Sequence, residues 1–283
     1  MAAFLSAQLD FIFFFYGLAF LLLGVVSFAI ARGAQGGVSW VALGVFGFVH
    51  GTAEWLDLLA LIVSDNPTFA IVRTAVMTAS FVCLVEAARL ELIQLNWTAP
   101  GRWVHLPLLL LVAMAGQFGG LTEANIVARY AIGLVGAMGM ALALALHARI
   151  FSGRERSLAA AAAVAFALYA IASGAIVPAA SFWPASVFNY AGFSGVTGVP
   201  IQFVRGLLAV SIVFTVWGIW GQKLIREVSS PRYTKYLQQQ FVWTLAAMAM
   251  ILLCGWVLTE YLGGIYRQNV QDEARGDLDL ERR

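Results

Sequence analysis

Long apolar stretches alternate with short polar connections along almost the whole chain. Each stretch is close to the roughly 20 residues that an α-helix needs to cross the hydrocarbon core of a bilayer. None has the period-two alternation of membrane β-strands. We therefore predict an all-α, polytopic helical membrane bundle with about eight transmembrane helices. The predicted spans are Phe11–Ala31, Val38–Val63, Phe69–Leu90, Val104–Leu121, Ile126–Ile150, Leu158–Val177, Phe203–Ile225 and Phe241–Leu262. Residues 1–264 would form this membrane domain, and residues 265–283 a polar, acidic tail.

The composition excludes several classes of protein. The 283 residues are 61% hydrophobic and only 11% charged, whereas soluble domains usually contain about 25% charged residues. A soluble enzyme, a disordered chain and a nucleic-acid-binding protein are therefore excluded. Cys83 and Cys254 both lie in apolar stretches, which argues against a disulfide framework or a cysteine metal site.

Basic residues in the connections predict the orientation. They gather in alternate connections: Arg32, Arg89, Arg102, Arg149, Arg154, Arg156, Lys223, Arg226, Arg232 and Lys235. The connections near Asp65, near Thr122 and across 180–200 contain none. The positive-inside rule then predicts an extracytoplasmic N-terminus and, with eight spans, an extracytoplasmic C-terminus.

The second span carries an unusual set of polar residues. Gly47, His50, Glu54 and Asp57 are three or four positions apart and share one face of the helix. Gly47 and Gly51 form a small-xxx-small pair, which allows a neighbouring helix to approach closely. The polar face is therefore expected to point into the protein rather than toward lipid.

Three further spans carry an arginine near the outer end: Arg73, Arg129 and Arg205. We expect them to point inward and to share one layer with Glu54 and Asp57, because ionisable residues in lipid are costly. Two interpretations remain open. The layer is either a structural network of acid–arginine pairs, or a pocket in which surplus positive charge binds a small anion.

His50 raises the question of haem. Bis-histidine ligation needs two histidines at similar depth, whereas His105 and His147 are expected near the inner face. We therefore predict no cofactor and no metal, and a His50 side chain that is hydrogen-bonded within the bundle. A proton relay through His50, Glu54 and Asp57 would instead suit a transporter.

The connection 180–200 is long, aromatic and free of charge. Its residues Phe182, Trp183, Asn189 and Tyr190 either lie on the membrane interface or form a lid over the charged layer. The lid interpretation follows from Arg205, which comes only five residues after Pro200.

Four segments resemble a known family: His50–Asp57, Phe182–Ser186, Gly195–Gly206 and Gly255–Gly263. Together they resemble the multi-span N-terminal membrane sensor region of bacterial histidine kinases and diguanylate cyclases. The resemblance implies signal transduction, a multi-pass protein of the bacterial inner membrane, and a homodimer. We expect the dimer contact on the eighth span, near Cys254.

These observations favour a non-enzymatic sensor module. The chain contains no histidine-kinase, GGDEF or ATP-binding motif, so the output would come from sequence outside it or from a separate chain. The expected partners are the lipid bilayer, a small anionic ligand and a second copy of the chain, and no nucleic acid. Two other functions remain open: a small-solute transporter, and an accessory subunit of a larger membrane complex.

Overall fold

The computed structural model describes residues 8–32, 38–63 and 65–227, together with isolated positions at 5, 235, 239, 250, 253–255, 257 and 261. The chain divides into two compact units, Met1–Ser229 and Ser230–Arg283. Most of the predicted eighth span, the dimer contact on it and the tail 265–283 lie outside the described residues.

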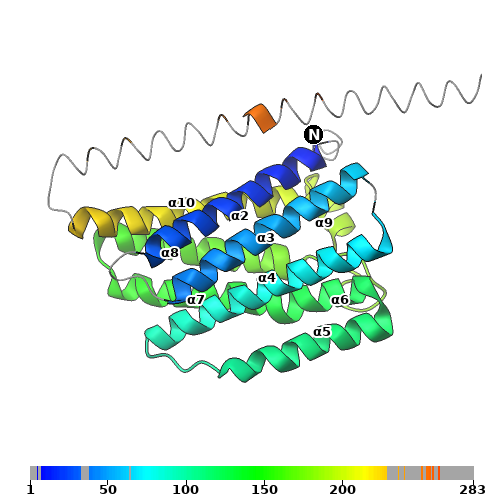
Figure 1. Cartoon of the computed structure of the whole chain (residues 1–283), viewed down its shortest axis with the longest axis horizontal. Helices are drawn as coiled ribbons and strands as arrows, with labels where there is room; N and C mark the ends of the chain where they lie inside the picture. Colours follow the sequence, from blue (N-terminus) through cyan, green and yellow to red (C-terminus); the bar gives the residue numbers. More distant parts are fainter. Residues whose placement is uncertain are drawn as a thin grey trace, which may run out of the picture. The chain divides into compact units, whose positions relative to one another are not determined.

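The predicted helical class is confirmed for the described residues, which form helices joined by connections and one isolated bridge between Val177 and Asn189. Six helices in this part of the chain are long and apolar enough to cross a membrane, which indicates a multi-pass membrane protein. Figure 1 shows them running side by side in a bundle. They are α2 (Leu9–Ala31), α3 (Val38–Val63), α4 (Pro67–Gln94), α6 to α7 (Leu121–Ile150), α8 with its extension (Gly153–Ala175) and α10 (Ile201–Glu227).

The predicted fourth span is shorter than the others. It forms α5 (His105–Gly119), whose 15 residues extend about 22 Å at 1.5 Å per residue, less than the roughly 30 Å of a bilayer core. The helix ends where Gly120 adopts φ 105°, a conformation that favours glycine. α5 lies at the edge of the bundle (Figure 1), and only Val112 among its side chains is buried.

Two π-helical segments interrupt the regular hydrogen-bonding of the long helices. Arg129–Gly133 joins α6 (Leu121–Ala128) to α7 (Leu134–Ile150), and Ala170–Ala175 extends α8 (Gly153–Tyr169). Single π-turns inside α-helices frequently occur at functional sites. Both segments contribute groups to the site described below.

α2 and α3 pack closely through glycine, as the Gly47 and Gly51 spacing predicts. A Cβ atom on Gly47 would lie 2.6 Å from Gly24 N and 2.7 Å from Phe20 O. A Cβ atom on Gly51 would lie 2.7 Å from Gly17 O. The two backbones therefore touch along this line, and the polar face of α3 points into the bundle, where His50 and Glu54 are buried.

Apolar side chains lie both inside the bundle and on its surface. The interior is a continuous cluster that includes Phe20, Phe46, Phe81 and Phe166. Many large apolar side chains are exposed on the outside, among them Val72, Leu110 and Met138. An apolar exterior around a packed interior is the pattern of a protein surrounded by lipid.

Candidate functional site

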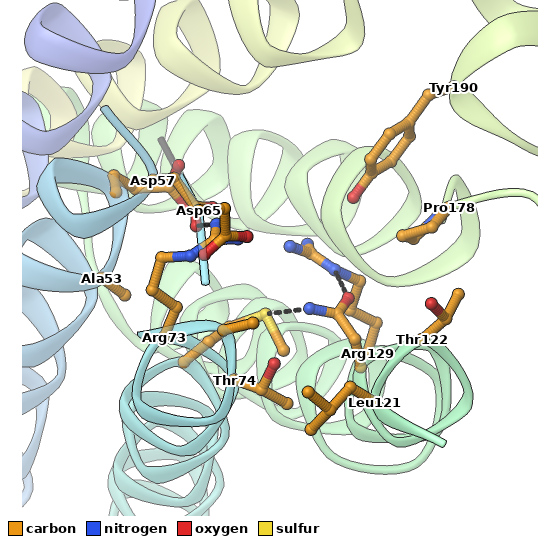
Figure 2. A pocket seen from close by; sticks show the side chains of 14 residues that line it. Ala53, Asp57, Asp65, Arg73, Thr74, Leu121, Thr122, Arg129, Pro178 and Tyr190 are labelled. Carbon is orange, nitrogen blue, oxygen red and sulfur yellow. Dashed lines mark hydrogen bonds and ion pairs between the residues drawn. The ribbon is translucent and has the colours of Figure 1, made fainter. Parts of the chain in front are cut away.

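A charged cavity of about 310 Å³ opens at the end of the bundle where α3 ends and α4, α6 and α10 begin. It is referred to below as the charged cavity. Its wall combines acidic, basic and hydroxyl-bearing side chains on a partly apolar frame (Figure 2). The polar and charged members are Glu54, Asp57, Asp65, Arg73, Thr74, Thr122, Asn125, Arg129 and Tyr190.

Arg73 lies on one side of the charged cavity between two carboxylates. Its guanidinium group donates to Asp57 near the end of α3 and to Asp65 in the α3–α4 connection. Asn66 places this arginine, because its side-chain oxygen accepts from Phe69 N at 2.9 Å and caps the start of α4. The positive charge of Arg73 is thus neutralised by the protein itself.

Arg129 lies on the opposite side, and its guanidinium group points into the cavity (Figure 2). The side chain is 4% exposed. Its Nε donates to Asn125 Oδ1 at 2.9 Å, and its Nη1 donates to the carbonyl oxygen of Ser173 at 3.2 Å. Its Nη2 forms no hydrogen bond with a described residue. Arg129 is therefore held rigidly by two bonds and keeps one donor for an occupant of the cavity.

Arg205 lies beside the charged cavity rather than in its wall. The side chain is 2% exposed. Its Nε donates to Ala172 O at 2.8 Å, and its Nη2 donates to Ile176 O at 2.7 Å. The guanidinium carbon lies 5.0 Å from the centre of the Tyr190 ring. Arg205 thus connects the start of α10 to the end of α8.

Both buried arginines satisfy the C-terminal end of the α8 extension. The last four carbonyl groups of a helix have no intrahelical partner, and they carry the negative end of the helix dipole. Arg129 and Arg205 donate to Ser173 O and Ala172 O in this turn, and Arg205 also donates to Ile176 O just after it. The guanidinium groups therefore replace the missing donors.

This arrangement differs from the expected acid–arginine network. Arg73 pairs with Asp57 as predicted, but neither Arg129 nor Arg205 forms an ion pair with a described carboxylate. The expected surplus of positive charge is also absent from the cavity wall, which contains three described carboxylates and two guanidinium groups. The reason is that carbonyl oxygens at a helix end compete with carboxylates for arginine.

Glu54 connects the charged cavity to a buried hydrogen-bond network. Its carboxyl group lines the cavity, and its Oε1 lies 3.4 Å from His50 Nε2. The same nitrogen lies 2.8 Å from the Tyr169 hydroxyl, which lies 2.8 Å from the Tyr16 hydroxyl. On the other side of the ring, His50 Nδ1 lies 2.8 Å from Ser80 Oγ. The network joins α2, α3, α4 and α8.

Hydrogen counting gives this network a direction. Ser80 donates its single hydroxyl hydrogen to Met77 O at 2.6 Å, so the neutral His50 ring must carry its hydrogen on Nδ1 and donate to Ser80. Nε2 is then an acceptor, so Tyr169 donates to it, and Tyr16 in turn donates to Tyr169. Glu54 therefore lies beside a hydrogen-bond chain whose members come from four helices.

His50 is hydrogen-bonded within the bundle, in agreement with the prediction. Both of its ring nitrogens have protein partners, and three phenylalanine rings pack around it: Phe20, Phe46 and Phe81. The other histidines point to acids at the far end of the bundle, His105 to Glu86 at 2.8 Å and His147 to Glu91 at 2.6 Å. In the described part of the chain, no three His, Cys, Asp or Glu side chains gather as metal ligands.

The four residues proposed for a lid do not act as one unit. Tyr190 begins α9 (Tyr190–Thr197) and lines the charged cavity. Asn189 is buried and caps α9 by accepting from Gly192 N at 2.9 Å. Phe182 and Trp183 are exposed and do not line the cavity. Of the connection 180–200, only Tyr190 therefore lines the cavity, together with Pro178 just before the connection, while the Phe182 and Trp183 side chains are exposed.

Several residues of the site were missed by the sequence patterns. Tyr16 and Tyr169 look like ordinary aromatic residues of apolar spans, although hydroxyl groups at such depth are a weak signal of a polar network. Ser80 gives a similar weak signal, while Asp65 is hidden among the other polar residues of its connection. Asn125 was expected just above the charged layer, and it does line the cavity. Glu54 was found because it shares one face of a helix with His50. None of the missed residues lies on that helix face.

Comparisons of the chain with protein-family models, with curated proteins and with solved structures find no match.

Proposed function

We propose that this chain is the signal-input module of a bacterial signal-transduction receptor, which binds a small acidic ligand in the charged cavity. The module itself has no catalytic role. The catalytic response to the signal is carried out by a kinase or cyclase domain. The observation that carries the proposal is the orientation of Arg129, whose free Nη2 points into a cavity that is continuous with the His50 network.

An acidic ligand fits the cavity because its two arginines differ. Arg73 is neutralised by Asp57 and Asp65, whereas Arg129 has no described carboxylate partner and is fixed by Asn125 and Ser173. A ligand carboxylate or phosphate would form a charge-assisted hydrogen bond with Nη2. Since the guanidinium group is already held in place, little conformational entropy is lost on binding.

Binding would be transmitted through Glu54. A negative group beside Arg129 repels the Glu54 carboxyl group across the same cavity, and Glu54 lies against His50 Nε2. The His50 network joins α2, α3, α4 and α8, so its rearrangement changes how these helices pack. A ligand that favours one packing shifts the population toward it.

A transporter is less well supported. Ser80 and Glu91 are eleven positions apart on α4, or about 16 Å along a helix. The buried side chains between them on α4 are five apolar ones, Phe81, Leu84, Val85, Ala87 and Ala88, and Arg89, which forms an ion pair with Glu86. Among the described residues, this segment offers few groups that could replace the hydration shell of a charged solute.

The proposed orientation has both termini outside the cytoplasm, with eight spans in the bacterial inner membrane. We expect a reporter fused after Gly153 to be cytoplasmic and one fused after Gly195 to be extracytoplasmic. The basis is the positive-inside rule, because Arg149, Arg154 and Arg156 flank Gly153 and the connection 180–200 has no basic residue. Paired phosphatase and fluorescent-protein fusions measure this, and the opposite pattern would reverse the proposed orientation.

Arg129→Lys tests the ligand site. The protein in nanodiscs is titrated with succinate, glycine and inorganic phosphate, and binding is measured by calorimetry. We expect at least one probe to bind, and Arg129→Lys to weaken that binding by about tenfold or more, because lysine keeps the charge but loses the planar fork. This corresponds to about 1.4 kcal/mol.

Arg102→Lys is the matched control, because Arg102 is exposed and does not line the charged cavity. The affinity of the Arg102→Lys variant for the bound probe should equal that of the unchanged protein. The ligand site is contradicted if none of the three probes binds, or if a folded Arg129→Lys variant binds as tightly as the unchanged protein. Flux of the bound probe into proteoliposomes would favour a transporter instead.

A further inference from the structure

A second cavity, of about 260 Å³, lies at the end of the bundle where α7 ends and α8 begins. We call it the acidic cavity. Its wall contains the carboxyl groups of Glu91 and Glu155 and the imidazole of His147. Both glutamates are buried, and no lysine or arginine is among the lining residues. The described wall therefore offers negative charge without a built-in guanidinium or ammonium group.

Glu91 has a free acceptor in this cavity. Its Oε1 lies 2.6 Å from His147 Nε2. Its Oε2 is buried and has no hydrogen-bond partner among the described residues. Glu91 as a whole is only 3% exposed, so water has little access to this oxygen. A buried carboxylate oxygen without a donor is costly, so an occupant that supplies an N–H group would be favoured there.

Aromatic rings complete the wall. Trp40 from the start of α3, Trp220 from α10 and Phe151 after α7 line the cavity. Phe151 stacks on His147, with ring centres 5.3 Å apart. Cations bind over aromatic faces, and tryptophan is the best partner. Acidic groups together with tryptophan rings point to an organic cation.

We infer that the acidic cavity binds a protonated alkylamine, whose N–H group donates to Glu91 Oε2 and whose charge lies against Trp40 and Trp220. A metal ion is a poorer fit, because no three metal-ligating side chains gather within the described residues.

The volume suits a small amine. At about 30 Å³ per water molecule, the cavity has room for about nine waters, which is enough for an alkylammonium group with a short chain. Two sources share this chemistry: a free amine, and the headgroup of a lipid such as phosphatidylethanolamine. The site is separate from the charged cavity and does not depend on a ligand there.

The first experiment uses the unchanged chain. It is placed in nanodiscs of phosphatidylglycerol and titrated with ethanolamine at pH 7, with binding measured by calorimetry. Ethylene glycol is the neutral control, and choline is a cation without N–H groups. We expect ethanolamine to bind at least tenfold more tightly than choline, and ethylene glycol not to bind.

A second set of nanodiscs distinguishes the two sources of the amine. If phosphatidylethanolamine in the bilayer blocks the binding of ethanolamine and raises the melting temperature above that in phosphatidylglycerol, the lipid headgroup occupies the site. If it changes neither quantity, the ligand is a free amine. Both results support an amine site.

Glu91→Gln tests the acceptor, because it is nearly isosteric and removes the charge. We expect at least a tenfold loss of affinity for ethanolamine, while Glu123→Gln in α6, which does not line this cavity, leaves it unchanged. Equal affinity in a folded Glu91→Gln variant would overturn the inference. So would equal binding of choline or ethylene glycol by the unchanged chain, or no ethanolamine binding together with no stabilisation by phosphatidylethanolamine. These wild-type comparisons remain decisive if Glu91→Gln does not fold.

Discussion

Arg205→Ala is expected to lower the free energy of unfolding by about 2–6 kcal/mol. The substitution removes the donors of two carbonyl groups, the buried Ala172 O and the part-buried Ile176 O, and each unsatisfied acceptor costs about 1–3 kcal/mol. It also removes the contact with the Tyr190 ring. Unfolding in mixed micelles, followed by circular dichroism as the denaturing detergent increases, measures the change.

Two further variants separate the role of Arg205 from a general effect of losing an arginine. Arg205→Lys should fall between the unchanged protein and Arg205→Ala, because an ammonium group lacks the planar fork that reaches both carbonyl groups. Arg102→Ala should change the stability by less than about 1 kcal/mol, since the Arg102 side chain is 79% exposed and its ion pair with Glu86 is long, at 3.5 Å. If Arg205→Ala and Arg102→Ala were equally stable, the capping role of Arg205 would be wrong.

Gly47→Val is expected to destabilise the bundle by about 3 kcal/mol or more, the upper end of the usual cost of overpacking. Even a Cβ atom at this position would lie 2.6 Å from Gly24 N. The atoms that it would meet belong to the backbone of α2, so no side-chain rotation relieves the clash and the helices must separate. The yield of monodisperse protein and the micelle unfolding midpoint measure the effect.

Gly221→Val is the matched control. Gly221 also lies within a long helix, α10, but an added Cβ atom there would meet nothing within 4 Å. Its stability should change only by a few tenths of a kcal/mol, as expected from helix propensity. A similar loss of stability in both variants would show that the close approach of α2 and α3 is not what requires glycine.

The predicted spans that lie within the described residues agree well with the helices. The predicted span Val38–Val63 coincides with α3, and the prediction Phe203–Ile225 lies inside α10 (Ile201–Glu227). Hydrophobic length is a property of consecutive residues, so it can be read locally. The predicted span Val104–Leu121 forms α5 (His105–Gly119), which ends two residues earlier because Gly120 adopts φ 105°.

The composition of the candidate site was only partly predictable. His50, Glu54 and Asp57 share a face of one helix, and the 3.6-residue period reveals this directly. The partners of Arg129 and Arg205 are backbone carbonyl groups at the end of a π-helical segment. Carbonyl groups are present at every position, so no residue type marks the ones that a distant arginine will reach.

The sequence by itself determined the helical class, most of the spans, the polar face of α3 and the glycine pair on α3 that allows a neighbouring helix to approach. Each depends on residues within one helix, where spacing alone decides which side chains lie together. Only the tertiary structure decided that Arg73 binds two acids, that Arg129 and Arg205 cap α8, and that Tyr16, Ser80 and Tyr169 surround His50. These contacts join residues as far as 153 positions apart, and they depend on helix rotation and depth, which follow from the packing of the whole bundle.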